Sequence, residues 1–321
     1  MNPGRSLCLA LCLLASQVLA QAPAADCPPP LQAPTQEQVQ AAASAARDRG
    51  ALWRVSRGGH SSYLFGTIHV GKLDWAAPGP QMRAALNATD TIALEIDPTD
   101  PQMAAGLATM GSASGGAPPS LPSPLAARLA GRLASACVPA AARPVIGAMH
   151  PVMQVLTLSV LEARREGLEA GYAQEFVLAG FGRAAKRPIV SLETPESQLA
   201  ALMPRGTDEL NQAVAGALDQ LDQGQSRQTI TRLAQAWARG DLEDLAQYEQ
   251  WCDCIKSEAD RKMMKRLLDD RNPPLAERIE ALHREGRKVF AGVGALHMVG
   301  ATGLPTLLRA RGFTVERVAF Q

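Results

Sequence analysis

Two histidines occupy the same local pattern near opposite ends of the sequence. The stretch YLFGTIHVG places His69 three residues after Gly66, and the stretch VGALHMVG places His297 three residues after Gly294. Each follows an apolar run of the kind that forms a buried strand, and glycine lets the backbone bend or approach another group closely. A single histidine in this position is more often a hydrogen-bonded structural residue. Two in the same pattern favour a shared function in metal binding or acid–base chemistry.

Two carboxylates also follow apolar strands. Glu95 comes directly after TIAL, and Glu193 follows PIVSL. A charge at the position of Glu95, in an otherwise apolar run, requires a partner, whereas Glu193 has the alternative role of an acid ahead of a helix. In open α/β sheets, sites form outside the carboxyl ends of parallel strands. If the four strands are neighbours, two imidazoles and two carboxylates converge. Mn²⁺, Co²⁺ or Zn²⁺ could then bind there and activate a water molecule.

Arg271 and Asn272 stand immediately before two prolines at the end of a charged helical stretch. They are either a solvated helix end or a guanidinium and an amide that reach an oxyanion or a substrate carbonyl. The remaining histidines attract less interest. We expect His60 to be exposed in a turn, His150 to cap a helix or to orient a site residue from outside the site, and His283 to be solvated on a polar helix face.

The elements that would position these residues follow from periodicity and from cap and turn signals. Strands are expected at 52–55, 63–68, 91–97, 187–193, 288–297 and 313–320. Helices are expected at 35–49, 78–88, 124–136, 151–166 and 302–311, and nearly throughout 194–286, with a mobile Gly/Ser/Pro-rich loop at 111–123. The pattern predicts an α/β fold with a central mixed β-sheet and a large helical middle section.

The N-terminus has the features of a secretory signal peptide. Arg5 precedes a short apolar run, and Ala20 or Ala22 offers a small-residue cleavage point, so residues 1–22 are expected to be removed on export to the periplasm or the medium. A lipoprotein box fits less well, because Leu11 precedes Cys12 and Asp26 precedes Cys27. No later segment is long and apolar enough to span a bilayer. The 32 basic and 31 acidic residues give no basic surface for nucleic acid.

Four cysteines remain after the signal peptide: Cys27, Cys137, Cys252 and Cys254. In an exported chain they favour disulfides, and three pairings are possible. A metal role for the Cys-Asp-Cys stretch is the alternative, although this spacing is not a strong zinc signature.

Several segments, taken together, resemble the TraB/PrgY/GumN family and most closely its GumN-type bacterial members. They are YLFGTIHVG, ALEID, PIVSLETPESQ, the Arg-Asn pair, and AGVGALHMVGATGLPTLLRARGFTV, and they occur in this order from about residue 50 to the C-terminus. The resemblance is looser between about 104 and 185. It implies one α/β domain over 51–321, with a helical insertion at about 101–187, preceded by an extension and a helix at 23–50.

The resemblance also implies a function. The family is related to the Tiki metal-dependent proteases and is similar in fold to ChaN-like haem-binding and erythromycin-esterase-like proteins. Carried over, His69, His297 and Glu95 would form the metal and catalytic centre, and Arg271 with Asn272 would match a further motif. One departure concerns a carboxylate, because members often show Gly-Leu/Val-Asp where this chain has Gly-Tyr-Ala at 171–173. Glu175 is nearby but out of register.

The sequence therefore predicts an exported metal-dependent hydrolase that acts on a peptide or protein. Glu95 would be a metal ligand or general base, and Glu193 a fourth ligand or an orienting group. Serine-hydrolase, Walker A, dinucleotide-binding and H-E-x-x-H motifs do not occur in the sequence. The alternative is a non-catalytic periplasmic protein that binds a peptide, haem or an envelope ligand.

Overall fold

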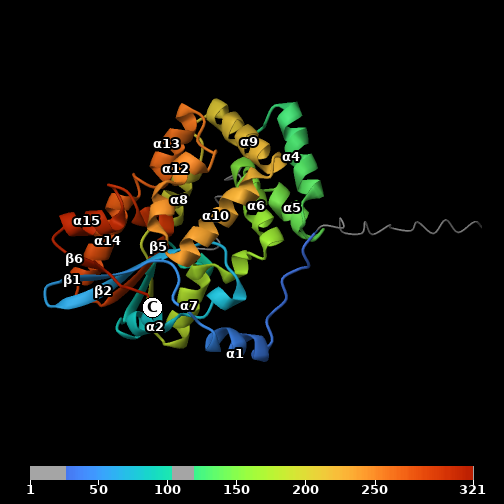
Figure 1. Ribbon diagram of the computed structural model, residues 1–321. Coiled ribbons are helices and arrows are strands. Elements are labelled where there is room, and N and C mark those ends of the chain that lie inside the picture. The colour runs from blue at the N-terminus through green and yellow to red at the C-terminus, as the bar shows by residue number, and fades with distance from the viewer. Residues whose placement is uncertain (1–26, 103–118, 321) are drawn as a thin grey trace, which may run out of the picture.

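The computed structural model describes residues 27–102 and 119–320 (Figure 1). Its centre is a six-stranded mixed sheet in the order β4-β3-β5-β2-β1-β6. The strands are β1 (Leu52–Arg57), β2 (His60–Thr67), β3 (Thr91–Leu94), β4 (Ile189–Ser191), β5 (Val289–Gly294) and β6 (Thr314–Arg317). The pairs β4–β3, β3–β5 and β5–β2 are parallel, and β1 runs antiparallel to both β2 and β6. The predicted α/β fold with a mixed sheet is confirmed.

A tight hairpin joins β1 to β2. Its turn residues, Gly58 and Gly59, have φ values of 61° and 84°, and Arg57 pairs with His60 across the turn. Two consecutive positive φ values are what a type I′ hairpin turn requires, and glycine adopts them without steric cost. The Gly-Gly pair therefore fixes the register of β2 and with it the direction in which the chain leaves Thr67.

Helices cover both faces of the sheet. On one face, α14 (Asn272–Arg284) and α15 (Leu304–Ala310) pack through leucine, isoleucine and alanine side chains against the β-strands. On the other, α2 (Pro80–Asn87) and α7 (Gln174–Ala184) pack against Phe65, Ile92 and Phe290. Both faces of the central strands are buried, which is why these strands read as continuous apolar runs rather than as alternating patterns.

A second group of helices has its own core. α4 (Ser123–Ser135), α6 (Pro151–Glu162) and α9 (Thr207–Asp222) bury leucines and valines against one another, and α10 (Gln225–Arg239) connects this group to the sheet domain through a smaller cluster. Figure 1 shows these helices gathered on the side of the sheet away from α1 and α2. The remaining elements are α1 (Gln36–Ser44), η1 (Leu73–Trp75), α5 (Ala142–Gly147), η2 (Ala163–Glu166), η3 (Ala170–Tyr172), α8 (Pro195–Leu202), α11 (Leu242–Ala246), α12 (Tyr248–Trp251), α13 (Glu258–Leu267) and η4 (Ala295–Met298).

Most predicted elements are present, with shorter ends. The helix expected at 35–49 ends at Ser44, and the strand expected at 91–97 ends at Leu94. The signal peptide at 1–22 and most of the loop at 111–123 lie outside the described residues. Within the described residues, no helix is both long and apolar enough to cross a bilayer.

The four cysteines form two disulfides. Cys27 pairs with Cys137 and Cys252 with Cys254, which selects one of the three possible connectivities. The Cys-Asp-Cys stretch is therefore oxidised in this structure rather than arranged as a thiolate metal site.

Two predictions about histidines are wrong, those for His283 and His60. His283 is not solvated: it is buried, and its ring stacks on His60 at a centroid distance of 3.7 Å. Its Nδ1 lies 2.9 Å from the Ser62 hydroxyl, and its Nε2 lies 2.9 Å from the Arg57 carbonyl. His60 is accordingly half-buried rather than exposed. His150 does cap α6, where its Nδ1 accepts from the Val152 N–H at 3.3 Å.

Candidate active site

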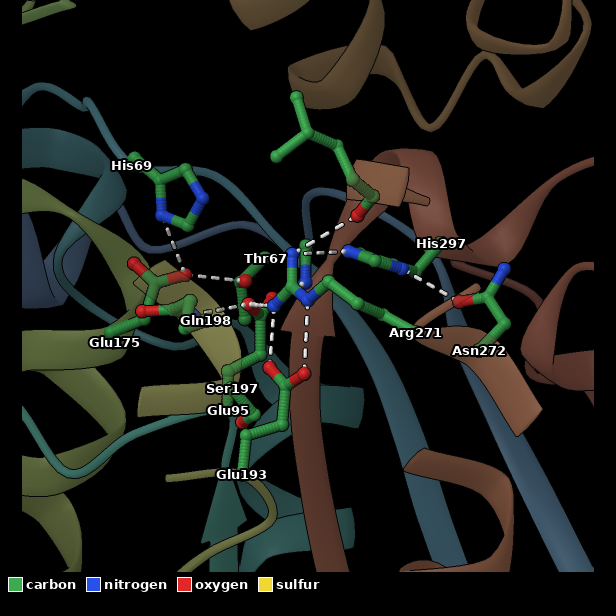
Figure 2. Close-up of polar contacts among 12 residues, drawn as sticks. Thr67, His69, Glu95, Glu175, Glu193, Ser197, Gln198, Arg271, Asn272 and His297 are labelled. Carbon is green, nitrogen blue, oxygen red and sulfur yellow. Dashed lines mark hydrogen bonds and ion pairs between the residues drawn. The ribbon is translucent and has the colours of Figure 1, made fainter. Parts of the chain in front are cut away.

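Four neighbouring parallel strands deliver the predicted side chains to one edge of the sheet. In the order β4, β3, β5, β2, the residues just beyond the strand ends are Glu193, Glu95, His297 and His69. Leu94 pairs with both Ser191 and Gly292, and Thr67 pairs with Gly294, so β4 and β3 end together and two residues before β5 and β2. The four residues therefore lie at one edge of the sheet, as expected from the carboxyl ends of parallel strands; Figure 2 shows Glu193 and His297 beside Arg271, and His69 beside Glu175.

Arg271 lies between the two carboxylates (Figure 2). Its Nε donates to Glu193 Oε1 at 2.9 Å, and its Nη2 contacts both Glu193 Oε2 and Glu95 Oε2. The side chains of Arg271, Glu95 and Glu193 are only 12%, 8% and 6% exposed. Burial by itself opposes the charge on Arg271, but the two carboxylates outweigh it and raise its pKa. Glu193, a candidate metal ligand, thus has both oxygens engaged in holding Arg271.

Asn272 orients the ring of His297. The Asn272 amide nitrogen donates to the Thr302 carbonyl at 2.9 Å, so its Oδ1 faces His297 Nδ1, 2.6 Å away. An amide oxygen only accepts, so Nδ1 must carry the proton, and the lone pair is on Nε2. Burial lowers the pKa of His297 to about 4. Glu95 opposes this shift, while Arg271, whose Nη1 lies 3.4 Å from Nε2, and His69 lower the pKa by smaller amounts. The imidazole is therefore neutral at pH 7.

Glu95 is held as a carboxylate. Its Oε1 accepts from the Gly294 N–H at 2.7 Å, and its Oε2 accepts from Gln198 Nε2 at 3.1 Å as well as from Arg271. Burial alone would raise the pKa of Glu95, but the surrounding histidines, Arg271 and the Gly294 N–H bring it down to about 2. Because His297 is uncharged at neutral pH, Arg271 is the main counter-charge there.

His69 has a partner that the sequence did not indicate. Its Nδ1 lies 3.2 Å from Glu175 Oε1, which also accepts from the Thr67 hydroxyl at 2.5 Å. Glu175 raises the pKa of His69, and the shift is moderated by solvent because the His69 side chain is 69% exposed. The Glu175 side chain is 13% exposed, and its Oε2 has no hydrogen-bond partner within the described residues. A carboxylate from α7, Glu175, thus lies beside His69.

Gly66 and Gly294 are needed because neighbouring atoms lie close to their Cα atoms, and not because their backbone conformation is unusual. Gly294 has a φ of −47°, which any residue can adopt. A Cβ atom there would lie 3.2 Å from Glu95 Oε1, 3.5 Å from His297 Cδ2 and 3.9 Å from His69 Nε2. A Cβ at Gly66 would lie 3.2 Å from Met298 Cγ and 3.3 Å from Ala295 Cα. Gly66 therefore lets η4, which carries His297, pack against β2.

The site opens into a pocket of about 260 Å³. His69, Glu95, Arg271 and His297 form its polar floor. Its other wall is mostly apolar and comes from the helical region, with Leu233, Trp237, Leu245, Tyr248, Met264, Leu267 and Leu268 as the lining residues. A substrate in this pocket would contact the polar strand ends on one side and aliphatic side chains on the other.

The donor groups fit a divalent ion in chemical type and in the orientation of their imidazole rings, but not in their spacing. Both imidazoles are oriented through Nδ1, by Glu175 and Asn272, as second-shell partners orient metal-binding histidines. His69, His297 and Glu95 surround the space that a Cβ at Gly294 would fill. Across residues 27–102 and 119–320, however, no group of three or more His, Cys, Asp or Glu side chains is close enough to hold a metal ion. Binding an ion would therefore require the three side chains to close in around this space.

Comparison with known proteins agrees with the motif positions. The model of the TraB/PrgY/gumN family matches residues 51–317. Proteins named "Uncharacterized protein YbaP" from Shigella flexneri and from Escherichia coli K12 are each 22% identical over 278 residues, which cover 80% of this chain and 97% of theirs. No solved structure matches the chain significantly.

Proposed function

The chain belongs to the TraB/PrgY/gumN family, and we propose that it is an exported metal-dependent hydrolase that cleaves peptide bonds. The single observation that carries this proposal is the row of Glu193, Glu95, His297 and His69 beyond four adjacent parallel strand ends, of which Glu95, His297 and His69 line one pocket. The two disulfides support an oxidising compartment such as the periplasm.

In this proposal His69 and His297, through their Nε2 atoms, and Glu95 hold Mn²⁺, Co²⁺ or Zn²⁺. When bound, such an ion polarises a carbonyl oxygen and lowers the pKa of a water molecule. Of the two roles considered for Glu95, ligand is better supported than general base. A carboxylate with a pKa of about 2 is a weak proton acceptor at neutral pH but a persistent anion.

The other residues prepare the site. Asn272 and Glu175 keep the two imidazoles in the tautomer and orientation that present Nε2 to the pocket. Glu193 holds Arg271. One Nη1 N–H of Arg271 donates to the Leu267 carbonyl at 3.1 Å, and the other makes only a long contact of 3.4 Å with His297 Nε2. This N–H group is available to a substrate carbonyl oxygen, on which negative charge develops as water adds to the carbon. Asn272 is buried and has both amide atoms engaged, so we assign it to positioning rather than to substrate contact.

A non-catalytic binding protein is the second candidate. It is favoured by one observation: Arg271 neutralises the two buried carboxylates and occupies the position between them and His297 Nε2. A protein that captures a peptide, haem or an envelope ligand needs a stable polar floor of this kind but no open position for an ion.

Peptide-library cleavage by the purified mature protein separates the two candidates. We expect cleavage with added Mn²⁺, Co²⁺ or Zn²⁺, its loss in EDTA, and its loss in His69→Ala and His297→Ala. The matched control is His60→Ala, which removes a histidine outside the site. Tight capture of peptides without turnover under every metal condition would contradict the hydrolase and favour the binding protein. A Soret band on haem addition that is lost in the two site variants would favour a haem carrier.

A further inference from the structure

Part of the apolar wall of the pocket comes from a helix that has no buried residue of its own. In α13, no residue is buried in the protein, and Met264 and Leu267 line the pocket together with the following Leu268. The opposite surface of α13 is charged and exposed, with Arg261 and Glu258 paired at 3.1 Å. An amphipathic helix normally covers its apolar stripe with protein. Here that stripe faces a cavity.

Polar contacts, rather than core packing, hold α13 over the site. Ser257 and Asp260 form a capping box at its N-terminus, and Arg266 pairs with Glu209 at the start of α9. At its C-terminal end, the Leu267 carbonyl accepts from Arg271 Nη1 at 3.1 Å. The hydrogen bond between Leu267 and Arg271 therefore links the apolar wall directly to the polar floor.

The helices before α13 extend the same surface. Leu233 and Trp237 of α10, Leu245 of α11 and Tyr248 of α12 line the pocket. Burial raises the pKa of Tyr248 to about 12, so its ring carries no charge, and its hydroxyl contacts Cys254 Sγ at 3.5 Å. The one guanidinium in the lining, on Arg271, is committed to Glu95 and Glu193. The wall thus offers no counter-charge for a charged group.

We propose that this pocket binds a large aliphatic or aromatic side chain of a substrate peptide, next to the bond that faces the polar floor. The inference rests on the proposed function, because it names the substrate class of the same site. The volume of the pocket, about 260 Å³, lies below the roughly 300–1,000 Å³ of sites that enclose a whole small molecule. A side chain fits this volume, with the peptide backbone left at the mouth beside Arg271 and His69.

The test compares fluorescein-labelled peptides that differ at one position, Leu or Phe against Ser or Asp. Anisotropy in EDTA measures binding without turnover, and cleavage with Mn²⁺ measures turnover. Burying one such side chain predicts roughly tenfold or more tighter binding of the Leu and Phe peptides. Met264→Glu, which places a carboxylate in the wall, is expected to abolish this preference, and Met264→Leu to keep it.

Gln250→Glu is the matched control, because it adds the same charge at an exposed position of α12 outside the lining. Circular dichroism melts of every variant exclude unfolding as the cause. Three results would overturn the inference. They are equal binding of all four peptides, a preference for the Leu and Phe peptides that is unchanged in Met264→Glu, and tighter binding of fatty-acyl vesicles than of any peptide. Cleavage without preference would overturn it while leaving the hydrolase standing. Preferential binding without cleavage would support the pocket and contradict the hydrolase.

Discussion

Asn272 Oδ1 lies 2.6 Å from His297 Nδ1, and this contact decides which nitrogen of the imidazole faces the pocket. Asn272 opens α14 and His297 lies in η4, so the bond joins two elements that are separate in sequence. The Asn272 amide is itself fixed by the Thr302 carbonyl. The Thr302 carbonyl therefore holds the Asn272 amide, and Asn272 in turn orients the ring of His297.

Removing this contact should weaken the site more than the fold. We expect Asn272→Ala to lower metal affinity or peptide cleavage by roughly 10- to 100-fold, as loss of an orienting partner does at metal sites. Isothermal titration with Mn²⁺ and initial cleavage rates measure the effect. Asn87→Ala, at an exposed position of α2, serves as the control. An Asn272→Ala protein with wild-type affinity and rate would show that His297 needs no such partner.

Arg271 should be essential for stability. Arg271→Met leaves Glu95 and Glu193 buried without a counter-charge, and breaking a buried pair from one side costs about 3–5 kcal/mol. Urea unfolding monitored by circular dichroism measures the loss. Arg261→Met, which breaks an exposed pair with Glu258, is the control and should change little. If the two variants unfold at the same urea concentration, the ion pairs of Arg271 with Glu95 and Glu193 do not stabilise the fold as predicted.

The two disulfides should differ greatly in their contribution. Cys27 and Cys137 are 110 residues apart, whereas Cys252 and Cys254 are 2 apart. In the chain-entropy model, closing the longer loop stabilises the fold by about 5 kcal/mol and the shorter one by about 1–2 kcal/mol. Matched double Cys→Ala variants, compared by urea unfolding, test this ranking. Equal losses, or a larger loss from the Cys252/Cys254 variant, would contradict it.

His283 should make stability depend on pH. Burial lowers the pKa of His283 below its ordinary value of 6.5, so below pH 6.5 the unfolded chain binds a proton that the folded chain resists. Stability therefore falls as pH drops through and below 6.5, and it is restored above that range. We expect the difference in unfolding free energy between wild type and His283→Gln to shrink as pH falls from 8 to 5. A difference that stays constant over this range would contradict the assignment, and the exposed Arg284→Gln is the control.

The row of ligand candidates was predictable from sequence because it depends on local patterns. An apolar strand followed directly by an ionisable residue occurs four times, and the parallel-sheet rule places such residues on one edge. His283 also left a readable signal: it shares an apolar helical face with Leu275, Ile279 and Leu282, all buried in α14. The wrong prediction came from the charged residues that directly follow His283 in the sequence. The residues that share its helical face are apolar and indicate burial.

The contacts that complete the site were not predictable in this way. Glu175 reaches His69 from α7, and Arg271 reaches Glu193 across 78 residues of sequence. These pairings depend on how helices dock against the strand ends, which no local periodicity encodes. The sequence signals for Glu175 are weak: it lies out of register with the Asp of the family motif, and an acid in the first turn of a mostly apolar helix is explained by the helix N-terminus alone.

The most direct test of the account is the metal content of the purified mature protein after equilibration with Mn²⁺, Co²⁺ or Zn²⁺ and removal of excess ion. Inductively coupled plasma mass spectrometry counts the ions, with His60→Ala as the control variant. The account predicts one ion per chain in wild type and in the control, and loss of that ion in His69→Ala and His297→Ala. A wild-type protein that retains no divalent ion, or a His69→Ala protein with wild-type metal content, would contradict it.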